Sequence, residues 1–342
     1  MKRVLLFGSS GFIGGRVRAA LTADDRIGEV LCPGRDRHDL VRGDVTGLTA
    51  LIADAAPDAV VCCVGALTGT AQELLLANTL VAAKLLEAVA AAAPRARLVR
   101  LGSAGEYGAV PHGRSVAEDD RTEPVGAYGV SHLAGTRLFA LAGESGRVDA
   151  VSVRVFNPIG AGQPAENVLG RAALRLREAL ATGSAEITLG PLGAYRDFVD
   201  AHDVAALIRT IVLAPQVPAR VYNAGSGRAV TVREAVGMLA GQAGWTGTVH
   251  EAGTGTTWST ATWPGSPPWS PRPRRTPSCA AWARSPAPRK SCCGPTHWWP
   301  RSCWRRSPRP HRRPAWSGSA RPASTASSRT AGRSPRTIAP NR

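Results

Sequence analysis

The sequence predicts an α/β protein built on a doubly wound parallel sheet, and three observations carry this prediction. Short apolar runs alternate with stretches of helical periodicity through residues 1–250. A glycine-rich turn, residues 8–14, directly follows the first apolar run. The run at residues 59–64 contains no polar residue, which is typical of a parallel strand covered on both faces.

The predicted strands and helices follow one another in order. Apolar runs predict strands at residues 3–7, 29–32, 59–64, 97–101 and 150–156. Helical spacing predicts intervening helices at residues 12–21, 71–93 and 127–141. Strands separated by helices form right-handed crossovers, so these strands are expected to be parallel. Less regular segments suit a second, smaller part, with helices at 168–180, 202–213 and 232–242 and a strand at 220–222.

Residues 251–342 differ in composition from the rest of the chain. They hold 17 of the 42 Lys and Arg but 1 of the 25 Asp and Glu, so nearly all of the net charge of +17 lies here. Ile338 is their only Ile, Leu or Val, and they carry 16 of the 26 prolines. Such a segment can build neither a packed core nor long helices. We therefore predict a low-complexity, disordered tail over residues 253–342.

Two interpretations of this tail stay open. Its Arg, Pro, Ser, Ala, Gly, Trp and Cys content is typical of GC-rich DNA translated out of frame, with the frame lost near residues 253–262. Alternatively, the tail is an Arg/Pro-rich arm that binds acidic partners, and its tryptophans could stack on single-stranded nucleic acid. Its Trp and Arg positions show no repeat, and residues 1–250 carry a net charge of only +1. Nucleic acid is therefore not the expected partner.

The sequence also predicts the cellular location of the protein. No apolar run reaches the roughly 18–20 residues of a membrane helix, and the four apolar residues before Gly8 are too few for a signal peptide. Seven cysteines are an odd number, and Cys32, Cys62 and Cys63 lie in or beside predicted strands, which argues against a disulfide framework. Cys62-Cys63 lacks metal-ligand spacing. We expect a cytoplasmic protein without membrane association or bound metal.

The glycine-rich turn has the pattern of a dinucleotide-binding loop. Gly8, Gly11 and Gly14 recur at every third position, and Phe12 and Ile13 begin the following helix. Glycine lets the backbone turn tightly and approach a pyrophosphate. The N-terminus of the helix adds unpaired N–H groups and a partial positive charge. These five residues are therefore predicted to bind the diphosphate of NAD or NADP.

The end of the second strand bears on the choice between these cofactors. An acid at this position commonly binds the ribose 2′-hydroxyl of NAD. Here the strand runs into Cys32-Pro33-Gly34-Arg35. The guanidinium of Arg35 suits a 2′-phosphate, which favours NADP. Alternatively, Arg35 is a solvent-exposed arginine in a basic loop. Asp36 is also near the strand end, so NAD remains a possible cofactor.

A second group of residues carries a family resemblance. Ser103 follows the fourth strand, and Tyr128 and His132 share one helix face because they are four residues apart. With these and the glycine turn, residues 1–252 resemble the extended short-chain dehydrogenases, which include nucleotide-sugar epimerases, dehydratases and reductases. The branch of GDP-mannose dehydratases and 4-keto-6-deoxyhexose reductases is the most similar. Further matching segments are 42–45, Asn78, 154–160, 195–200 and 222–227.

The resemblance implies how the chain is organised. It implies a Rossmann domain over residues 1–160, to which 201–225 return, and a substrate-binding part over 161–252. It also implies that Asp44 and Val45 contact the adenine, and that Gly65 lies at the cofactor. Members of the family pair the helices equivalent to 71–93 and 127–141 in a dimer, so we expect a homodimer. Burial of these helices within one chain is the alternative.

The resemblance also implies roles in a nucleotide-sugar site. Tyr128 would be the general acid or base at the sugar oxygen, and Ser103 would hydrogen-bond the same oxygen. Tyr128 and residue 132 would also contact the cofactor, whose nicotinamide carries the hydride. Asn157 and Arg196 would hold the nucleotide diphosphate, Arg196 through its planar guanidinium. An ion pair between Arg196 and a neighbouring aspartate, Asp197 or Asp200, is the alternative.

One departure from the family lies at His132, where the family has lysine. A tyrosine has an ordinary pKa of about 10 and needs a nearby positive charge to react near neutrality, whereas histidine is mostly neutral there. From the sequence we therefore expect impaired catalysis, down to an NAD(P)-binding protein without turnover. We also expect His132→Lys to raise any residual activity.

A second departure narrows the reaction. The 4,6-dehydratases of the family carry an acid pair directly after the Ser or Thr, and here these positions are Ala104 and Gly105. Glu106 comes one residue late, which on an extended segment would turn its side chain away. A dehydratase is therefore disfavoured. A 4-ketoreductase of a nucleotide 4-keto-6-deoxyhexose is expected, and an epimerase is the alternative.

Overall fold

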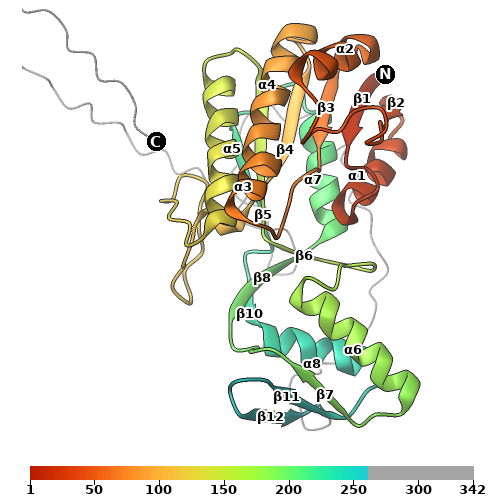
Figure 1. Cartoon of the computed structure of the whole chain (residues 1–342), viewed down its shortest axis with the longest axis vertical. Helices are drawn as coiled ribbons and strands as arrows, with labels where there is room; N and C mark the ends of the chain where they lie inside the picture. Colours follow the sequence, from red (N-terminus) through yellow and green to blue (C-terminus); the bar gives the residue numbers. More distant parts are fainter. Residues whose placement is uncertain (261–342) are drawn as a thin grey trace, which may run out of the picture. The chain divides into compact units, whose positions relative to one another are not determined.

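A computed structural model describes residues 1–260 (Figure 1). Its main sheet has six parallel strands in the order β2-β1-β3-β4-β5-β9. These are β1 (Lys2–Phe7), β2 (Ile27–Leu31), β3 (Ala59–Cys62), β4 (Arg97–Ser103), β5 (Asp149–Val155) and β9 (Val221–Ala224). The predicted doubly wound α/β class is confirmed. Residues 261–342, which hold most of the predicted tail, lie outside the described residues.

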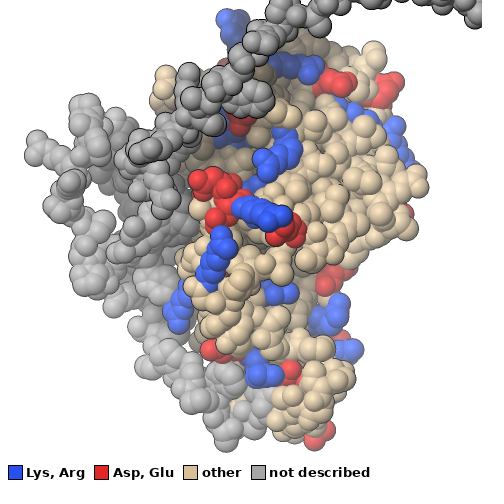
Figure 2. All heavy atoms as spheres, turned by 90° about the vertical axis from the view of Figure 1, so that its left-hand side faces the viewer, with Lys and Arg blue, Asp and Glu red and all other residues tan. Residues whose placement is uncertain are grey.

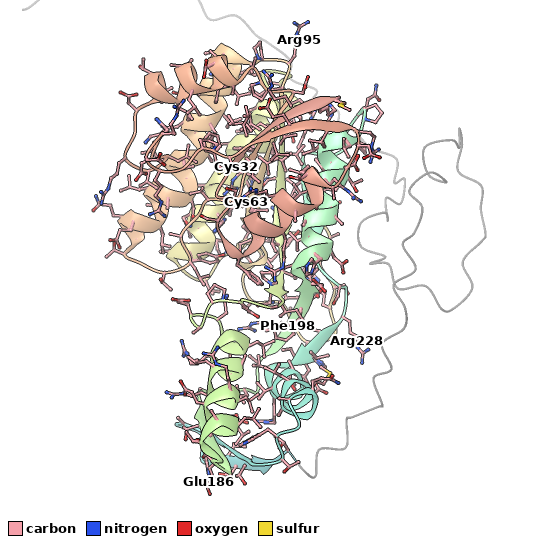
Figure 3. The ribbon with its side chains drawn as sticks, turned by 90° about the vertical axis from the view of Figure 1, so that its right-hand side faces the viewer. Cys32, Cys63, Arg95, Glu186, Phe198 and Arg228 are labelled. Atoms are coloured by element: carbon pink, nitrogen blue, oxygen red, sulfur yellow. The ribbon has the colours of Figure 1, made fainter. Side chains whose placement is uncertain are left out.

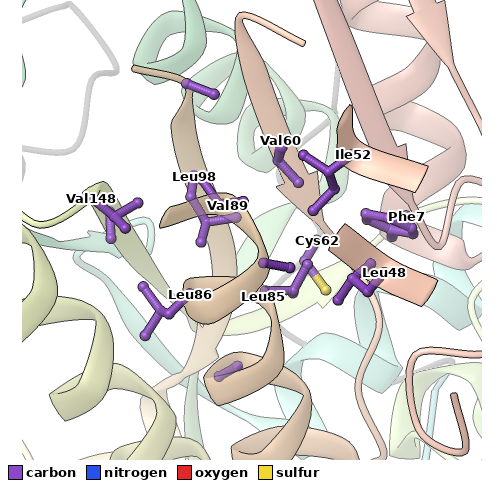
Figure 4. Close-up of a cluster of buried hydrophobic side chains, with 14 of the residues drawn as sticks. Phe7, Leu48, Ile52, Val60, Cys62, Leu85, Leu86, Val89, Leu98 and Val148 are labelled. Atoms are coloured by element: carbon purple, nitrogen blue, oxygen red, sulfur yellow. The ribbon is translucent and has the colours of Figure 1, made fainter. Parts of the chain in front are cut away.

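Helices cover both faces of this sheet, and two apolar clusters fill the layers between. One cluster lies under α1 (Phe12–Thr22) and α7 (Ala201–Leu213), and the other under α2 (Val45–Ala55), α4 (Val81–Ala92) and α5 (Ala127–Glu144). Figure 4 shows the second cluster, in which Phe7, Val60 and Leu98 of three strands meet the helices. Successive residues of a strand point to opposite faces. The unbroken apolar run of β3 therefore supplies both clusters.

The long helix predicted at residues 71–93 contains a wider turn. It runs through α3 (Ala71–Leu74), the π-helical segment η1 (Leu75–Leu80) and α4, and Thr70 begins it with a capping box. By length and composition alone, Ala71–Ala92 could cross a membrane, although 44% of its most apolar window is buried in the protein. We did not predict this because Glu73, Lys84 and Glu87 interrupt the apolar run. Buried core helices of soluble proteins can be equally long and apolar.

Two small sheets and two helices form the rest of the described chain. One sheet has the order β10-β8-β6 and the other β12-β11-β7. The helices α6 (Val168–Thr182) and α8 (Val232–Gln242) pack on them around a third apolar cluster. The strands are β6 (Asn157–Ile159), β7 (Glu186–Leu189), β8 (Tyr195–Asp200), β10 (Ala229–Thr231), β11 (Thr248–Glu251) and β12 (Thr256–Ser259). The predicted start of the tail, residue 253, falls in the turn between β11 and β12.

Candidate active site

The glycine turn lies between β1 and α1. Gly8 has a φ of +79°, which favours glycine. A Cβ on Gly14 would lie 1.9 Å from the Gly8 carbonyl oxygen, so only glycine fits there. Within the described residues, no side chain caps the first turn of α1, whose N-cap is Gly11. The turn and the N–H groups of this helix end therefore fit a pyrophosphate, which Gly8, Gly11, Phe12, Ile13 and Gly14 would hold.

The loop after β2 leaves the carboxyl edge of the sheet, the same edge as the glycine turn after β1, because the two strands are parallel neighbours. Figure 3 labels Cys32 and Cys63, which directly follow β2 and β3 at the carboxyl edge of the sheet. Arg35 and Asp36 are both exposed, so either could meet a ribose substituent. Burial raises the pKa of the Cys62 thiol to about 11, so this cysteine stays protonated within the core.

Asp44 and Val45 begin helix α2, which the sequence reasoning missed. The Asp44 carboxylate caps the helix by accepting a hydrogen bond from the Gly47 N–H at 2.7 Å. Val45 packs against the core. Lys84 of α4 steadies the preceding loop by donating to three backbone carbonyls, those of Leu40, Val41 and Gly43.

Ser103 and Tyr128 come together at the end of β4. Ser103 is the last residue of that strand, and its hydroxyl accepts a hydrogen bond from the Gly105 N–H. Tyr128 lies in the first turn of α5 with its ring near Ser103, since a Cβ on Gly105 would lie 3.3 Å from Ser103 Oγ and 3.4 Å from Tyr128 Cε1. Burial raises the pKa of the Tyr128 phenol, while Ser103 and the positive charge of Arg100 oppose this and the Glu106 carboxylate adds to it. The pair can therefore present a proton to a substrate oxygen.

His132 lies beside Tyr128, as predicted from their spacing. The two rings meet edge to face with centroids 4.6 Å apart. The side chain is buried, and this burial, with the adjacent charge of Arg100, lowers the pKa of His132 to about 3. His132 is therefore neutral at physiological pH and brings no positive charge to the phenol.

Gly65 lies close to the same histidine. A Cβ on Gly65 would lie 3.0 Å from Asn78 Oδ1 and 3.9 Å from His132 Cε1. Asn78, in the π-helical segment, accepts from the Ala66 N–H and donates to the Ser131 hydroxyl. The wide turn of η1 thus places an amide that ties the loop after β3 to helix α5.

Glu106 does not lie on an extended segment, so our sequence-based reason for discounting it was wrong. Ala104–Glu106 is a 3₁₀ turn, η2, that folds the carboxylate back to the Ser103 N–H at 3.0 Å. Glu106 is fully buried and forms an ion pair with Arg154 at 2.7 Å. It also accepts from Thr136. The carboxylate is therefore engaged by three groups of the protein.

Arg100 is a site residue that the sequence reasoning missed. It lies in β4, three residues before Ser103, and its side chain is 4% exposed. Its guanidinium lies 3.5 Å from His132 Nδ1 and donates to the Thr136 hydroxyl at 3.0 Å. An arginine flanked by the apolar residues Val99 and Leu101 in a strand of a covered parallel sheet is the signal that could have found it.

The two predicted diphosphate ligands lie in the smaller sheets. Asn157 begins β6 and donates to the Asp197 carbonyl oxygen at 2.9 Å. Arg196 is exposed on β8, and the only described hydrogen bond of its side chain goes to the Tyr195 carbonyl oxygen. Asp197 accepts from Ser226 and Gly227, and Asp200 pairs with His202. Among residues 1–260, neither aspartate pairs with Arg196, which leaves its guanidinium available for an anion.

A family model and known proteins match most of residues 1–260. The model of the NAD dependent epimerase/dehydratase family matches residues 4–225. A dTDP-6-deoxy-L-talose 4-dehydrogenase (NAD(P)(+)) of Kitasatospora kifunensis is 40% identical over 255 residues, which cover 71% of this chain and 79% of the relative. A GDP-6-deoxy-D-mannose reductase of Pseudomonas aeruginosa is 29% identical over 249 residues, covering 70% and 79%.

Solved structures show the same fold. RMD from Pseudomonas aeruginosa complexed with NADPH aligns with a TM-score of 0.66 and 27% identity, covering 74% of this chain and 86% of that one. UDP-glucose 4-epimerase from Thermus thermophilus in complex with NAD aligns with a TM-score of 0.63 and 26% identity, covering 74% and 88%. These matches show an NAD(P)-dependent enzyme that modifies nucleotide sugars. The chain belongs to the NAD-dependent epimerase/dehydratase family.

Proposed function

We propose that the protein is a 4-ketoreductase that interconverts a nucleotide 4-keto-6-deoxyhexose and the corresponding 6-deoxyhexose. The closeness of the Ser103 hydroxyl and the Tyr128 ring, which both lie against Gly105 at the carboxyl end of β4, is the observation that carries this proposal. The two named relatives support it, because one is a 4-dehydrogenase and the other a reductase of 6-deoxyhexoses. A bound nicotinamide would supply the hydride to the carbonyl carbon.

The side chains of the protein supply the proton and hold the sugar in position for the reaction. Tyr128 donates its phenolic proton to the carbonyl oxygen as that oxygen gains charge, and Ser103 holds the same oxygen by a hydrogen bond. Arg196 and Asn157 bind the diphosphate and so orient the sugar. Glu106 takes no part in removing water, because Arg154, Thr136 and the Ser103 N–H occupy its carboxylate.

An assay with NADPH and dTDP- or GDP-4-keto-6-deoxyhexose tests the reaction. A reductase oxidises one NADPH for each 6-deoxyhexose formed, which absorbance and product NMR both measure. An epimerase would instead give an isomer with no net change in the cofactor. Binding of NADPH without turnover would identify an impaired binding protein. Either of these last two results contradicts the proposal.

Replacing Arg196 with methionine should raise the KM for the nucleotide sugar by about 10- to 100-fold, because a charge-assisted phosphate contact is lost. The KM for NADPH should stay unchanged. Steady-state kinetics measures both constants. Arg175→Met on the exposed face of α6, where Arg175 pairs with Glu178, is the matched control. An unchanged sugar KM in Arg196→Met would remove this arginine from the site.

We also propose a preference for NADP over NAD through Arg35. Arg35→Ala should then raise the KM for NADPH by roughly tenfold and leave the KM for NADH unchanged, because only NADPH carries the 2′-phosphate. Arg95→Ala, at an exposed arginine between α4 and β4 (Figure 3), serves as the control. Equal effects on both cofactors would show that Arg35 does not read the phosphate.

The same proposal includes a cytoplasmic homodimer. Leu75, Leu80 and Leu141 are 43%, 40% and 63% exposed on the outer faces of η1 and α5. Figure 2, which faces the side where Figure 1 draws α5, shows a broad uncharged area. A second copy packing on this side would bury these side chains. Sedimentation equilibrium of the full chain tests it, and a monomer at micromolar concentration would contradict it.

A further inference from the structure

The guanidinium of Arg100 is a buried cation without an ion-pair partner among the described residues. The described hydrogen bonds of its side chain go to uncharged groups: the carbonyls of Asn78 and His132, the hydroxyls of Thr136 and Ser152, and Nδ1 of the neutral His132. The Glu106 carboxylate also acts on this cation, but it is already paired with Arg154 at 2.7 Å. A buried arginine is rarely left without an anion, because the desolvation of its charge is costly. The position therefore calls for a negative charge that forms nearby.

The Tyr128 phenolate is the anion that can form there. The guanidinium Nη2 of Arg100 lies 3.5 Å from His132 Nδ1, and the His132 ring meets the Tyr128 ring at 4.6 Å between centroids. Only one imidazole ring therefore separates the cation from the tyrosine. Because arginine can only donate, the Nδ1 of a neutral His132 accepts this contact and the proton lies on Nε2.

We propose that Arg100 is a positioning residue that supplies, from beneath helix α5, the positive charge that a lysine at residue 132 would otherwise supply to Tyr128. His132 then contributes only an uncharged Nε2–H donor, directed by the guanidinium. This inference rests on the proposed function, because it assigns Tyr128 a proton-transfer role. It replaces the sequence-based expectation that His132 by itself impairs catalysis.

The other groups that face this pair do not provide the charge. Ser103 of β4 and Glu106 of η2 act on Tyr128. Ser103 is uncharged, and the negative charge of Glu106 opposes ionisation of the phenol. From β3, Cys62 faces Arg100, and its thiol is protonated. From α5, His132 is neutral, since its pKa lies near 3. Arg100 is thus the one cation among the described groups that act on the Tyr128 phenol.

The test measures ionisation of Tyr128 in the full-length protein without substrate. The four tyrosines are replaced biosynthetically by 3-fluorotyrosine, whose more acidic phenol titrates while the protein is folded. Fluorine NMR follows each resonance with pH, and Tyr128→Phe identifies the resonance of residue 128. Arg100→Met should raise the titration midpoint of Tyr128 by at least about one pH unit, because an opposite charge is lost. Arg100→Lys, which keeps the charge, should restore most of this shift.

Two results would overturn the inference. One is an Arg100→Met midpoint equal to that of the unmodified sequence. The other is a His132→Gln midpoint raised as far as that of Arg100→Met, because this would mean that His132 provides the charge. Should Arg100→Met fail to fold, Arg100→Gln takes its place, since it keeps an N–H donor for the Asn78 and His132 carbonyls without the charge.

A double substitution tests the same idea by activity. His132→Lys alone puts a second cation beside Arg100, so kcat should fall by about tenfold or more rather than rise. In Arg100→Met/His132→Lys, the single cation at residue 132 should return kcat to near its original value. A gain of activity in His132→Lys alone contradicts the inference. If the fluorine titrations behave as expected but no keto sugar is reduced, the proposed reaction fails while the role of Arg100 stands.

Discussion

Tyr128→Phe is expected to lower kcat for reduction of the keto sugar by about 10²–10⁴-fold, the usual contribution of a general acid or base. The change removes only the phenolic hydroxyl, and the ring can still pack against His132. NADPH binding, measured by fluorescence titration, should therefore change by less than about threefold. Steady-state kinetics with NADPH and the nucleotide keto sugar measures kcat.

Tyr222→Phe provides the matched control for this prediction. Tyr222 lies in β9, and its hydroxyl accepts a hydrogen bond from the Ala219 N–H, away from Ser103. Its substitution should leave kcat unchanged. If Tyr128→Phe kept more than a tenth of the original kcat while folded and loaded with NADPH, another group would be donating the proton, and the assignment of Tyr128 would be wrong.

The main sheet could be predicted from the sequence because its strands lie between two helical layers. A strand buried on both faces, such as Ala59–Cys62, must be apolar throughout, and this leaves a strong local signal. The strands of the small sheets are only three to six residues long and keep one side exposed, as in the alternating burial of β7. Such short amphipathic runs resemble loops, so they were not predicted.

Local capping explains two of the differences between prediction and structure. Helix α2 has apolar residues at helical spacing, yet Thr46, Gly47 and Thr49 weaken its propensity. The Asp44 cap offsets this weakness. At Glu106, a reciprocal capping box with Ser103 creates a turn where an extended segment was expected. Ser-x-x-Glu is a readable capping signal, and it was overlooked because the segment was compared with the acid pair of the dehydratases.

Arg100 shows what a single sequence cannot provide. Its partners, such as Asn78, His132 and Ser152, come from η1, α5 and β5 and are between 22 and 52 residues away along the chain. No spacing rule connects these positions, so the replacement of lysine by histidine looked like a simple loss. The fold places the Arg100 guanidinium against this helix. In our proposal the positive charge has therefore moved from residue 132 to residue 100.

Gly14→Ala is expected to abolish cofactor binding. The added Cβ would lie 1.9 Å from the Gly8 carbonyl oxygen and 2.8 Å from its carbonyl carbon. Both are backbone atoms, so either the glycine turn or the start of α1 must move by an ångström or more. Because misplacement on this scale costs on the order of 100-fold in rate, kcat/KM for NADPH should fall at least that far. The melting temperature should fall as well, since the turn packs directly against Cys63 and Val64.

Gly15→Ala separates this steric effect from the loss of a glycine in the same helix. The nearest atom to its added Cβ is the Ser9 carbonyl oxygen at 3.5 Å, an ordinary contact. Alanine favours the helical state over glycine by about 1 kcal/mol. Gly15→Ala should therefore bind NADPH normally and melt at the same or a higher temperature. Equal NADPH affinity in the two variants would mean that the diphosphate is not held at this turn, and the cofactor would have to bind elsewhere on the sheet.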